Sequence, residues 1–429
     1  MNRCHALGAL AALALLAVGP AASANDAAEA PWSVAERSLL ASLSLLPSPS
    51  LPVPPSPSNA LADSPAAAAL GERLFFDTRL SANGEVSCAN CHQPTHAFAD
   101  STARSRGLSL TGRNAPTVLG GAYQRWLYWD GRRDSLWAQA LTPIEHPDEQ
   151  GLGRVAVLAV LAEDPTYREA WVDLFDEAPL DVSDAERFPL HATPRADAPA
   201  LAAWQQMASD DRARVDAAFA RVGKAIAAYE RTLLPAPSRF DRFVAALLAG
   251  DVTGGGYLSD EEQAGLRLFI GDRAQCTQCH NGPMFSNGGF HNIGLIARTA
   301  TADTADLGRA AAVREVREDP FNCLGPHSDA APADCAELRF MKARGADLLG
   351  AFRVPTLRNV ARTAPYMHDG RFADLAAVLA HYVAAPTQVL GHQELDPLRL
   401  DAEELAALIA FLHALSGESL DDGVAALTP

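Results

Sequence analysis

The sequence predicts a mainly α-helical fold with two similar domains and long loops between the helices. Apolar residues recur at spacings of three and four, the period of an amphipathic helix, while alternating strand patterns are scarce. A helix, a short loop and the motif C-x-x-C-H also occur twice in this order, and this internal repeat indicates two related domains. With 429 residues and 48% hydrophobic content, the chain is long enough for two or three domains with their own cores.

The N-terminal residues have the pattern of an export signal. Arg3 precedes an apolar run at residues 7–18, and the small residues A-S-A follow at 22–24. The run is shorter than the roughly 20 apolar residues that a membrane span needs, which disfavours a retained anchor. We expect residues 1–24 to be removed before Asn25, and no later stretch is apolar enough to cross a bilayer. The sequence therefore predicts a periplasmic protein without a transmembrane span.

A proline-rich leader is expected at residues 25–60. Its sequence LLPSPSLPVPPSPSN, residues 45–59, favours an extended polyproline conformation because proline lacks the amide hydrogen that a helix requires. We expect this leader to wrap or tether a first domain at residues 61–250. Glycines cluster in AGDVTGGGYLSD, and this cluster indicates the boundary to a second domain at residues 251–429.

Each domain is predicted to place a helix just before its C-x-x-C-H motif. A serine precedes an alanine-rich run over residues 64–74, and Ser259 and Glu262 have the spacing of a capping box that starts a helix reaching about residue 269. Both helices carry the pattern G-x-R-L-F. Further helical patterns are RVAVLAVLAEDP, DRARVDAAFARVGKAIAAYERTLL, DLAAVLAHYVAAP and DAEELAALIAFLHAL.

The charge balance is acidic, with 52 Asp and Glu residues against 35 Lys and Arg residues and a formal net charge of −17. This balance argues against nucleic acid as a partner, because the phosphate backbone attracts basic surfaces. A protein partner with a basic or neutral surface is compatible with it.

The cysteine count is low for a disulfide scaffold of this length. Of seven cysteines, Cys4 would leave with the signal and four belong to the repeated motif, which leaves Cys323 and Cys335. In an oxidising compartment we expect this pair to form a disulfide that closes a short loop, with two free thiols as the alternative.

The repeated motif C-x-x-C-H is the main chemical signal of the chain. Zinc would need further ligands near each motif, and a thioredoxin-like pair would need α/β surroundings; neither pattern is present. Covalent attachment of a c-type haem explains every position, since two thiols bind the porphyrin and the histidine ligates the iron. The two predicted attachment sites are Cys88, Cys91 and His92, and Cys276, Cys279 and His280.

Four further segments in the same order resemble the bacterial di-haem cytochrome c peroxidase and MauG superfamily. They are RNAPTVLGGAY, YWDGRRDSLWAQALTPIEHPDEQG, CHNGPMFSNGGFHNIG and FRVPTLRNVARTAPYMHDGRFADLAAVLAHY. The resemblance covers nearly everything after the leader. It implies two cytochrome c-like haem domains, with the peroxide-binding haem in the first domain and a six-coordinate haem in the second.

For the first haem, the resemblance implies a distal pocket made by Gln139, Pro143 and Glu149. A carboxylate in an apolar haem pocket can move a proton between the two oxygens of peroxide, and Glu149 is the candidate. Glu145, His146 and Asp148 in the same acidic stretch remain alternatives. The segment FADSTARSRGLSL after the motif has no histidine, so this haem is expected to be open, as in MauG.

The resemblance also implies a relay between the haems and a sixth ligand for the second one. Trp129 matches the tryptophan that relatives place between the two irons. Tyr382, fourteen residues after His368, matches the tyrosine ligand of MauG, with His381 and Met367 as competing ligands. An anionic phenolate favours oxidised iron, whereas methionine favours the ferrous state.

A calcium ion between the domains is a further implication of the resemblance. The matching positions are Asn114, Thr363 and Pro365, the last two through backbone carbonyls, and oxygen donors suit this cation.

The loop DPFNCLGPHSDAAPADCAELRF resembles the MbnH branch, which oxidises a tryptophan on its partner MbnP to kynurenine. The predicted function is therefore hydrogen peroxide-dependent oxidation of a tryptophan on a secreted MbnP-like partner, through a two-electron oxidised state that the two haems share. The surface tryptophan that MauG uses as an electron exit has no counterpart in IGDRAQ. One alternative is a peroxidase that takes electrons from a small cytochrome or cupredoxin, and another is a di-haem electron carrier without catalysis.

Overall fold

The computed structural model describes residues 31–46, 51–195, 198–296, 305–387 and 390–417. The predicted signal, residues 1–24, lies outside these ranges. Within them, no helix combines the length and apolar character needed to cross a bilayer.

The described part of the chain is mainly helical, as the sequence predicts, with one small two-stranded sheet. The α-helices are α2 Val34–Leu43, α3 Pro65–Phe76, α4 Cys88–Cys91, α5 Leu136–Glu145, α6 Arg154–Glu163, α7 Pro165–Phe175, α8 Ala198–Gln206, α9 Ser209–Glu230, α10 Arg239–Leu248, α11 Asp260–Ile270, α12 Arg309–Glu318, α13 Ala336–Arg339, α14 Leu375–Ala384 and α15 Ala402–His413. Strands β1 Phe290–His291 and β2 Phe352–Arg353 pair antiparallel, and short 3-10 helices, including η1 Thr78–Leu80 and η5 Cys276–Gln278, lie in the loops.

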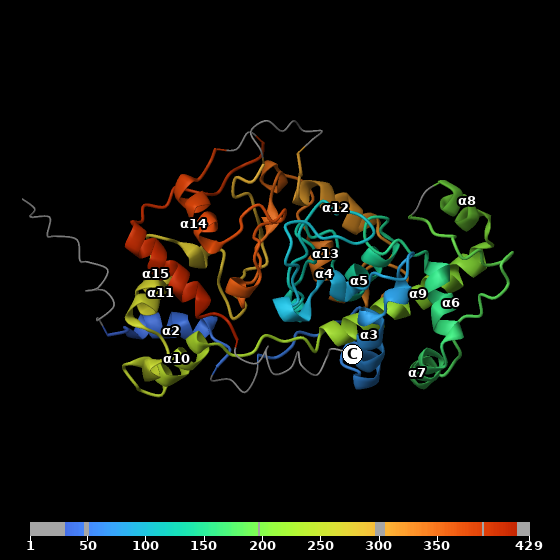
Figure 1. The fold of residues 1–429 in the computed structure, drawn as a ribbon, viewed down its shortest axis with the longest axis horizontal. Helices are drawn as coiled ribbons and strands as arrows, with labels where there is room; N and C mark the ends of the chain where they lie inside the picture. The colour runs from blue at the N-terminus through green and yellow to red at the C-terminus, as the bar shows by residue number, and fades with distance from the viewer. Residues whose placement is uncertain (1–30, 47–50, 196–197, 297–304, 388–389, 418–429) are drawn as a thin grey trace, which may run out of the picture.

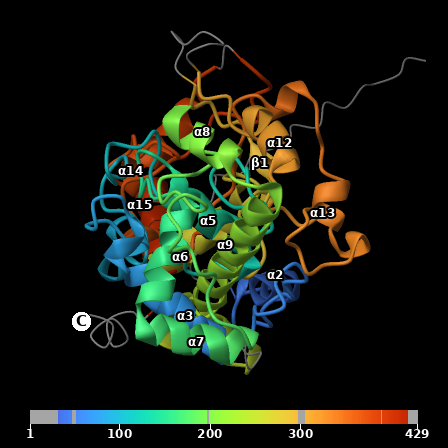
Figure 2. The same ribbon diagram turned by 90° about the vertical axis from the view of Figure 1, so that its right-hand side faces the viewer.

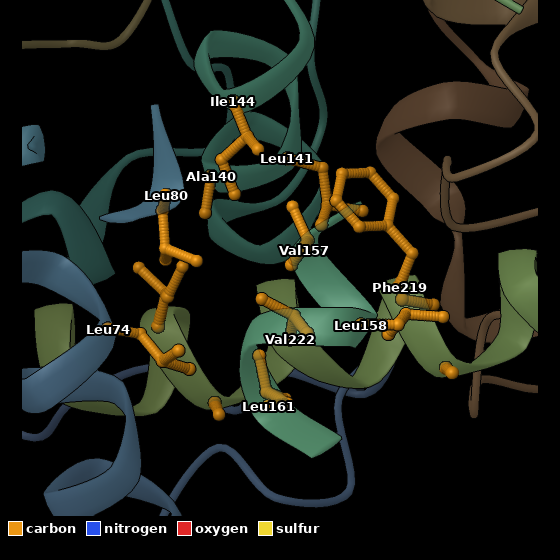
Figure 3. Close-up of a cluster of buried hydrophobic side chains, with 14 of the residues drawn as sticks. Leu74, Leu80, Ala140, Leu141, Ile144, Val157, Leu158, Leu161, Phe219 and Val222 are labelled. Atoms are coloured by element: carbon orange, nitrogen blue, oxygen red, sulfur yellow. The ribbon is translucent and has the colours of Figure 1, made fainter. Parts of the chain in front are cut away.

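The first hydrophobic core joins α3, α5, α6, α7 and α9, which form the right-hand group in Figure 1. Apolar side chains from α3, α5, α6, α9 and η1 point toward one another in Figure 3, with Leu74, Leu141, Leu158 and Phe219 among them. In the side view of Figure 2, α6 and α9 lie above α3 and α7. Burial of this apolar surface is the main stabilising contribution to this half of the chain.

The second hydrophobic core joins α2, α10, α11, α14 and α15, the left-hand group in Figure 1. Helix α10 precedes the predicted boundary at residue 250, yet its apolar face, with Phe240 and Phe243, packs entirely in this core. The transition between the two cores therefore falls between α9 and α10, at residues 231–238.

The predicted leader contributes a helix to the second core. Ser33 and Glu36 form a reciprocal capping box at the start of α2, and Leu40 and Leu43 are fully buried. Residues farther along the leader lie on the first half, where Ser58 accepts a hydrogen bond of 3.0 Å from the Trp137 indole. The leader thus contacts both halves, whereas the sequence analysis expected it to wrap or tether the first domain.

A buried ion pair fastens α2 to the second core. The Arg358 guanidinium makes hydrogen bonds of 2.6 and 3.0 Å to the two carboxylate oxygens of Asp241 in α10, and it also donates to the Leu43 carbonyl. The backbone amides of Leu45 and Ser238 and the hydroxyl groups of Ser44 and Ser238 also donate to this carboxylate. Such a pair is tolerated in a core because every polar atom has a partner.

The repeated pattern G-x-R-L-F has the same packing role in both halves. A Cβ atom added to Gly71 of α3 would lie 1.9 Å from the Ala225 carbonyl oxygen of α9, and one added to Gly265 of α11 would lie 1.9 Å from the Ala407 oxygen of α15. Each glycine therefore lets two helix backbones touch directly. This shared contact explains why the pattern recurs with the motif that follows it.

We expect Gly265→Ala to lower the free energy of unfolding by about 1–3 kcal/mol, because the added methyl group must push α11 away from α15. Chemical denaturation followed by circular dichroism measures this change. Glu261→Ala, on the exposed side of the same helix, is the matched control and should cost less than about 1 kcal/mol. Equal stability of both variants would contradict the direct helix contact.

The sheet of β1 and β2 lies between the two helical groups with the loops around α12 and α13 (Figure 1). Cys323 and Cys335 form a disulfide in this region, which confirms the predicted pairing.

Candidate functional site

Both C-x-x-C-H motifs fold into a single helical turn. The amide of His92 donates to the Cys88 carbonyl at 2.9 Å, and the amide of His280 donates to the Cys276 carbonyl at 2.8 Å. The turn places each histidine directly after its two cysteines. Cys88 and Cys91, like Cys276 and Cys279, have free thiols in the polypeptide.

The two histidines have one ring nitrogen occupied by the backbone. Nδ1 of His92 lies 3.3 Å from the Phe98 carbonyl oxygen, and Nδ1 of His280 lies 2.9 Å from that of Phe285. Donation from Nδ1 leaves Nε2 with its lone pair, the arrangement that iron ligation requires. Burial lowers the pKa of both imidazoles, to about 4 for His280, and therefore keeps them neutral.

A cavity of about 280 Å³ opens beside the first motif. The residues from the sequence analysis that line it are Cys88, Cys91, His92, Asn114, Trp129, Gln139, Pro143 and Glu149. Helix α5 contributes Gln139 and Pro143, and the loop after it contributes Glu149. The structure therefore brings the first motif and its predicted distal residues into one space.

Glu149 has the electrostatic setting of an acid–base group. Burial raises the pKa of its carboxyl, while His146 and Arg132 act in the opposite direction. Of the alternatives, Glu145 pairs with Arg154 inside the first core, and Asp148 accepts a hydrogen bond of 2.5 Å from Ser109.

His146, the third alternative, also lines the cavity. Its Nδ1 accepts a hydrogen bond of 3.3 Å from the Asp148 amide and lies 3.8 Å from a Glu149 oxygen. His146 is therefore placed to influence the titration of Glu149.

Trp129 lies where the first cavity meets the second half of the chain. Its ring packs with Leu295 and Phe352, both from the second half. Its indole donates a hydrogen bond of 2.9 Å to the Asn114 carbonyl, and its own carbonyl accepts one of 2.7 Å from the Arg353 amide. These contacts fix the ring at the junction of the two halves.

Tyr382, the candidate sixth ligand, lies on α14. Burial, followed by the thiols of Cys276 and Cys279, raises the pKa of its phenol, which places the ring beside the motif. His381 is turned away, with Nε2 2.7 Å from the Ile293 carbonyl. Met367 packs in the cluster around Trp129.

The predicted calcium positions lie on loops that meet between the halves. The backbone amide of Asn114 donates to the His368 carbonyl at 2.9 Å. This bond brings Asn114 to the loop that contains Thr363 and Pro365. Neither of those two carbonyls accepts a backbone hydrogen bond within the described residues. No cluster of three or more acidic, histidine or cysteine side chains suited to a metal occurs in the same ranges.

Polar residues that the sequence analysis did not name also line the first cavity, among them Arg353, Tyr128 and Glu230. Arg353 comes from β2, Tyr128 precedes Trp129, and Glu230 ends α9. The Tyr128 hydroxyl and one Glu230 oxygen are buried without a hydrogen-bond partner in the described part of the chain. Burial raises the pKa of Glu230 to about 8. No motif or periodicity identifies these residues, because only the tertiary fold brings them to the cavity.

Comparison with known proteins decides the family. The profile of the family described as "Di-haem cytochrome c peroxidase" matches residues 65–247. The methylamine utilization protein MauG of Methylorubrum extorquens is 30% identical, over 82% of this chain and 79% of its own. Cytochrome-c peroxidase IdrP1 of Denitromonas iodatirespirans is 32% identical, over 86% of this chain and 85% of its own. The chain belongs to the di-haem cytochrome c peroxidase and MauG family.

Solved structures agree with this membership. A MauG-like protein associated with microbial copper homeostasis is 27% identical, with a TM-score of 0.57, and the match covers 86% of this chain and 95% of that one. The di-haem peroxidase BthA of Burkholderia thailandensis, at 22% identity and a TM-score of 0.60 over 86% and 88% of the chains, shares the fold.

Members of this family are haem-dependent oxidoreductases, and membership implies two c-type haems. The residues of this chain fit that implication. Each motif offers two free thiols and a histidine with an available Nε2, and the first motif opens onto a cavity.

Proposed function

We propose that this protein uses hydrogen peroxide to oxidise a tryptophan side chain of a partner protein, in the manner of MauG and MbnH. The observation that carries the proposal is the single cavity shared by the first motif and Glu149, with Trp129 at its border to the second half. In this proposal Cys88, Cys91 and His92 hold the first haem. Cys276, Cys279 and His280 would hold the second, and Tyr382 would be a further ligand of its iron.

The haems, when bound, would supply iron that passes electrons from the partner's tryptophan to peroxide, and each peroxide takes up two electrons and two protons to become two molecules of water. Formation of kynurenine is a four-electron oxidation that incorporates oxygen from water and releases formate, so it consumes two peroxides. The chain's own residues transfer the proton of peroxide and hold the substrate in position. Glu149 as a carboxylate accepts the proton of the incoming peroxide and returns it to the departing oxygen. Gln139 and Pro143 confine the substrate in the cavity on the same side as Glu149.

In this proposal, Trp129 and Tyr382 allow the second half of the chain to share the oxidised state. Trp129 contacts residues of both halves and offers an aromatic ring for electron transfer between them. A phenolate ligand from Tyr382 would stabilise oxidised iron, which suits a store of oxidising charge and disfavours acceptance of electrons from ordinary cytochromes.

The MbnH-like assignment rests on the loop closed by Cys323 and Cys335 and on likeness to the MauG-like protein associated with copper homeostasis. It implies a small, secreted, MbnP-like partner, kynurenine as the oxidised product and a periplasmic location. Family members named as peroxidases support the second candidate function, peroxide reduction with electrons from a small cytochrome or cupredoxin.

The proposal includes a calcium ion between the halves. Asn114 would bind it through its side-chain oxygen, because its Nδ2 already donates to the Thr102 carbonyl at 2.8 Å. Thr363 and Pro365 would add backbone carbonyls, and such oxygen ligands match the preference of calcium.

The test of the proposed function uses a candidate partner, a small secreted MbnP-like protein that contains tryptophan. Peroxide is added to both proteins, and the partner is analysed by mass spectrometry. We expect a mass change on one tryptophan, its loss with Trp129→Phe, and its retention with Trp204→Phe, a buried indole away from the cavity. Peroxide consumption that needs reduced cytochrome and leaves the partner unchanged would favour the second candidate instead.

A further inference from the structure

Arg353 belongs to the second half of the chain, yet it lines the cavity of the first motif. It lies in β2 opposite Phe290, and only 4% of its surface is exposed. Its Nε donates to the Tyr128 carbonyl at 3.2 Å, and Nη1 lies 3.5 Å from the Val354 carbonyl. Nη2 makes no hydrogen bond to the part of the chain that the structure describes.

Two other arginines line the same cavity, and both are neutralised. Arg113 makes ion pairs of 2.6 Å with Asp130 and 2.7 Å with Asp306. Arg132 lies 3.2 Å from Asp130. Arg353 pairs with no carboxylate among the described residues, so it is the cavity arginine whose charge the protein leaves without compensation there.

A buried cation without a counter-ion is costly, because burial removes its hydration. Burial alone lowers the pKa of Arg353 to about 10, in line with an environment that supplies no negative charge. Arginine offers a planar fork of donors that matches a carboxylate. The position therefore calls for an anion that is not part of the described polypeptide.

We propose that Arg353 binds a carboxylate of the haem held by the first motif, so that the second half of the chain completes the first haem's site. The inference rests on the proposed haem attachment at Cys88 and Cys91, and on nothing about the partner protein. It assigns a residue to the cofactor's propionate side chains, the anionic groups that a c-type haem brings into a cavity.

The ion pair between Arg353 and the haem carboxylate should affect electron transfer at the first haem. Arg353 also donates hydrogen bonds to the backbone carbonyls of Tyr128, through Nε, and of Trp129, through its amide. A fixed positive charge here favours the reduced form of the first haem and keeps its carboxylate ionised. The reduction potential of that haem should then be insensitive to pH near neutrality.

The test is spectroelectrochemical titration of the resting holoprotein at several pH values. Arg353→Gln should lower the reduction potential of the first haem and make it rise as pH falls, because an unpaired carboxylate takes up a proton on reduction. Arg353→Lys keeps the charge and should resemble the wild type in both respects. Arg309→Gln is the matched control, since Arg309 is also buried and donates to carbonyls, but does not line the cavity.

An Arg353→Gln protein with unchanged potential and pH dependence would overturn the inference, as would an effect on the second haem instead. If that variant fails to fold, Arg353→Lys decides, because a lowered and pH-dependent potential there would show that charge is not the cause. The titration uses neither peroxide nor partner, so failure of the proposed tryptophan oxidation leaves it intact. Absence of haem on the peptide with Cys88 and Cys91, measured by mass spectrometry, would remove both proposals.

Discussion

Replacing Glu149 with glutamine is expected to slow peroxide consumption by about 10²–10⁴-fold, the usual contribution of a positioned acid–base group. Glutamine keeps the size of the side chain but can no longer accept a proton. Stopped-flow absorption of the first haem with peroxide measures the step directly. Asp148→Asn is the control, because this neighbouring acid bonds to Ser109 and does not line the cavity.

The pH dependence of the same step adds a second readout. The active form of Glu149 is the carboxylate, so the rate should fall as pH decreases through its pKa, which burial raises. His146 lowers that pKa, and His146→Asn should therefore move the acid limb to higher pH. A full rate for Glu149→Gln, or an unmoved limb for His146→Asn, would assign the proton transfer to another group.

Replacing Tyr382 with methionine is expected to raise the reduction potential of the second haem strongly. Axial ligands set haem potentials over a range of about 0.8 V, and exchange of an anionic phenolate for a neutral thioether removes the preference for oxidised iron. The variant should accept electrons from small cytochromes and lose oxidation of the partner. Potentiometric titration of the low-spin haem measures the shift.

His381→Asn is the matched control for this substitution, since the neighbouring His381 ring bonds to the Ile293 carbonyl. It should leave the potential of the second haem unchanged. If His381→Asn shifts the potential and Tyr382→Met does not, the sixth ligand is His381.

Local sequence signals predicted the helices of the repeat well. Ser259 and Glu262 form the capping box at the start of α11, and α3 begins after the capping residue Ser64. These features depend on residues three or four apart, which is why the sequence alone identifies them. The pairing of Cys323 with Cys335 was predictable because only two cysteines remained after the motifs.

Features that depend on tertiary packing could not be predicted from the sequence. The prolines of the leader predict an extended conformation, although Ser33 and Glu36 carry a capping-box signal for α2. Where α10 packs depends on the shape of the second core rather than on the glycines that follow the helix. Arg353 lies far from the first motif in the chain, so its place in that cavity follows only from the fold.

More residues of the candidate site were predicted from the resemblance of motifs than from hydrophobic periodicity. The resemblance named Gln139, Pro143 and Glu149, and the structure gathers all three around the first cavity. Their roles, like that of Tyr382, stay predictions until the holoprotein is measured.

Electron paramagnetic resonance of the ferric holoprotein tests most directly the claim that one haem is open to peroxide and the other is closed by Tyr382. We predict one high-spin signal from the first haem and one low-spin signal from the second, with only the low-spin signal altered by Tyr382→Met. Two low-spin signals that Tyr382→Met leaves unchanged would contradict the account, and would indicate an electron carrier or a peroxidase that needs activation.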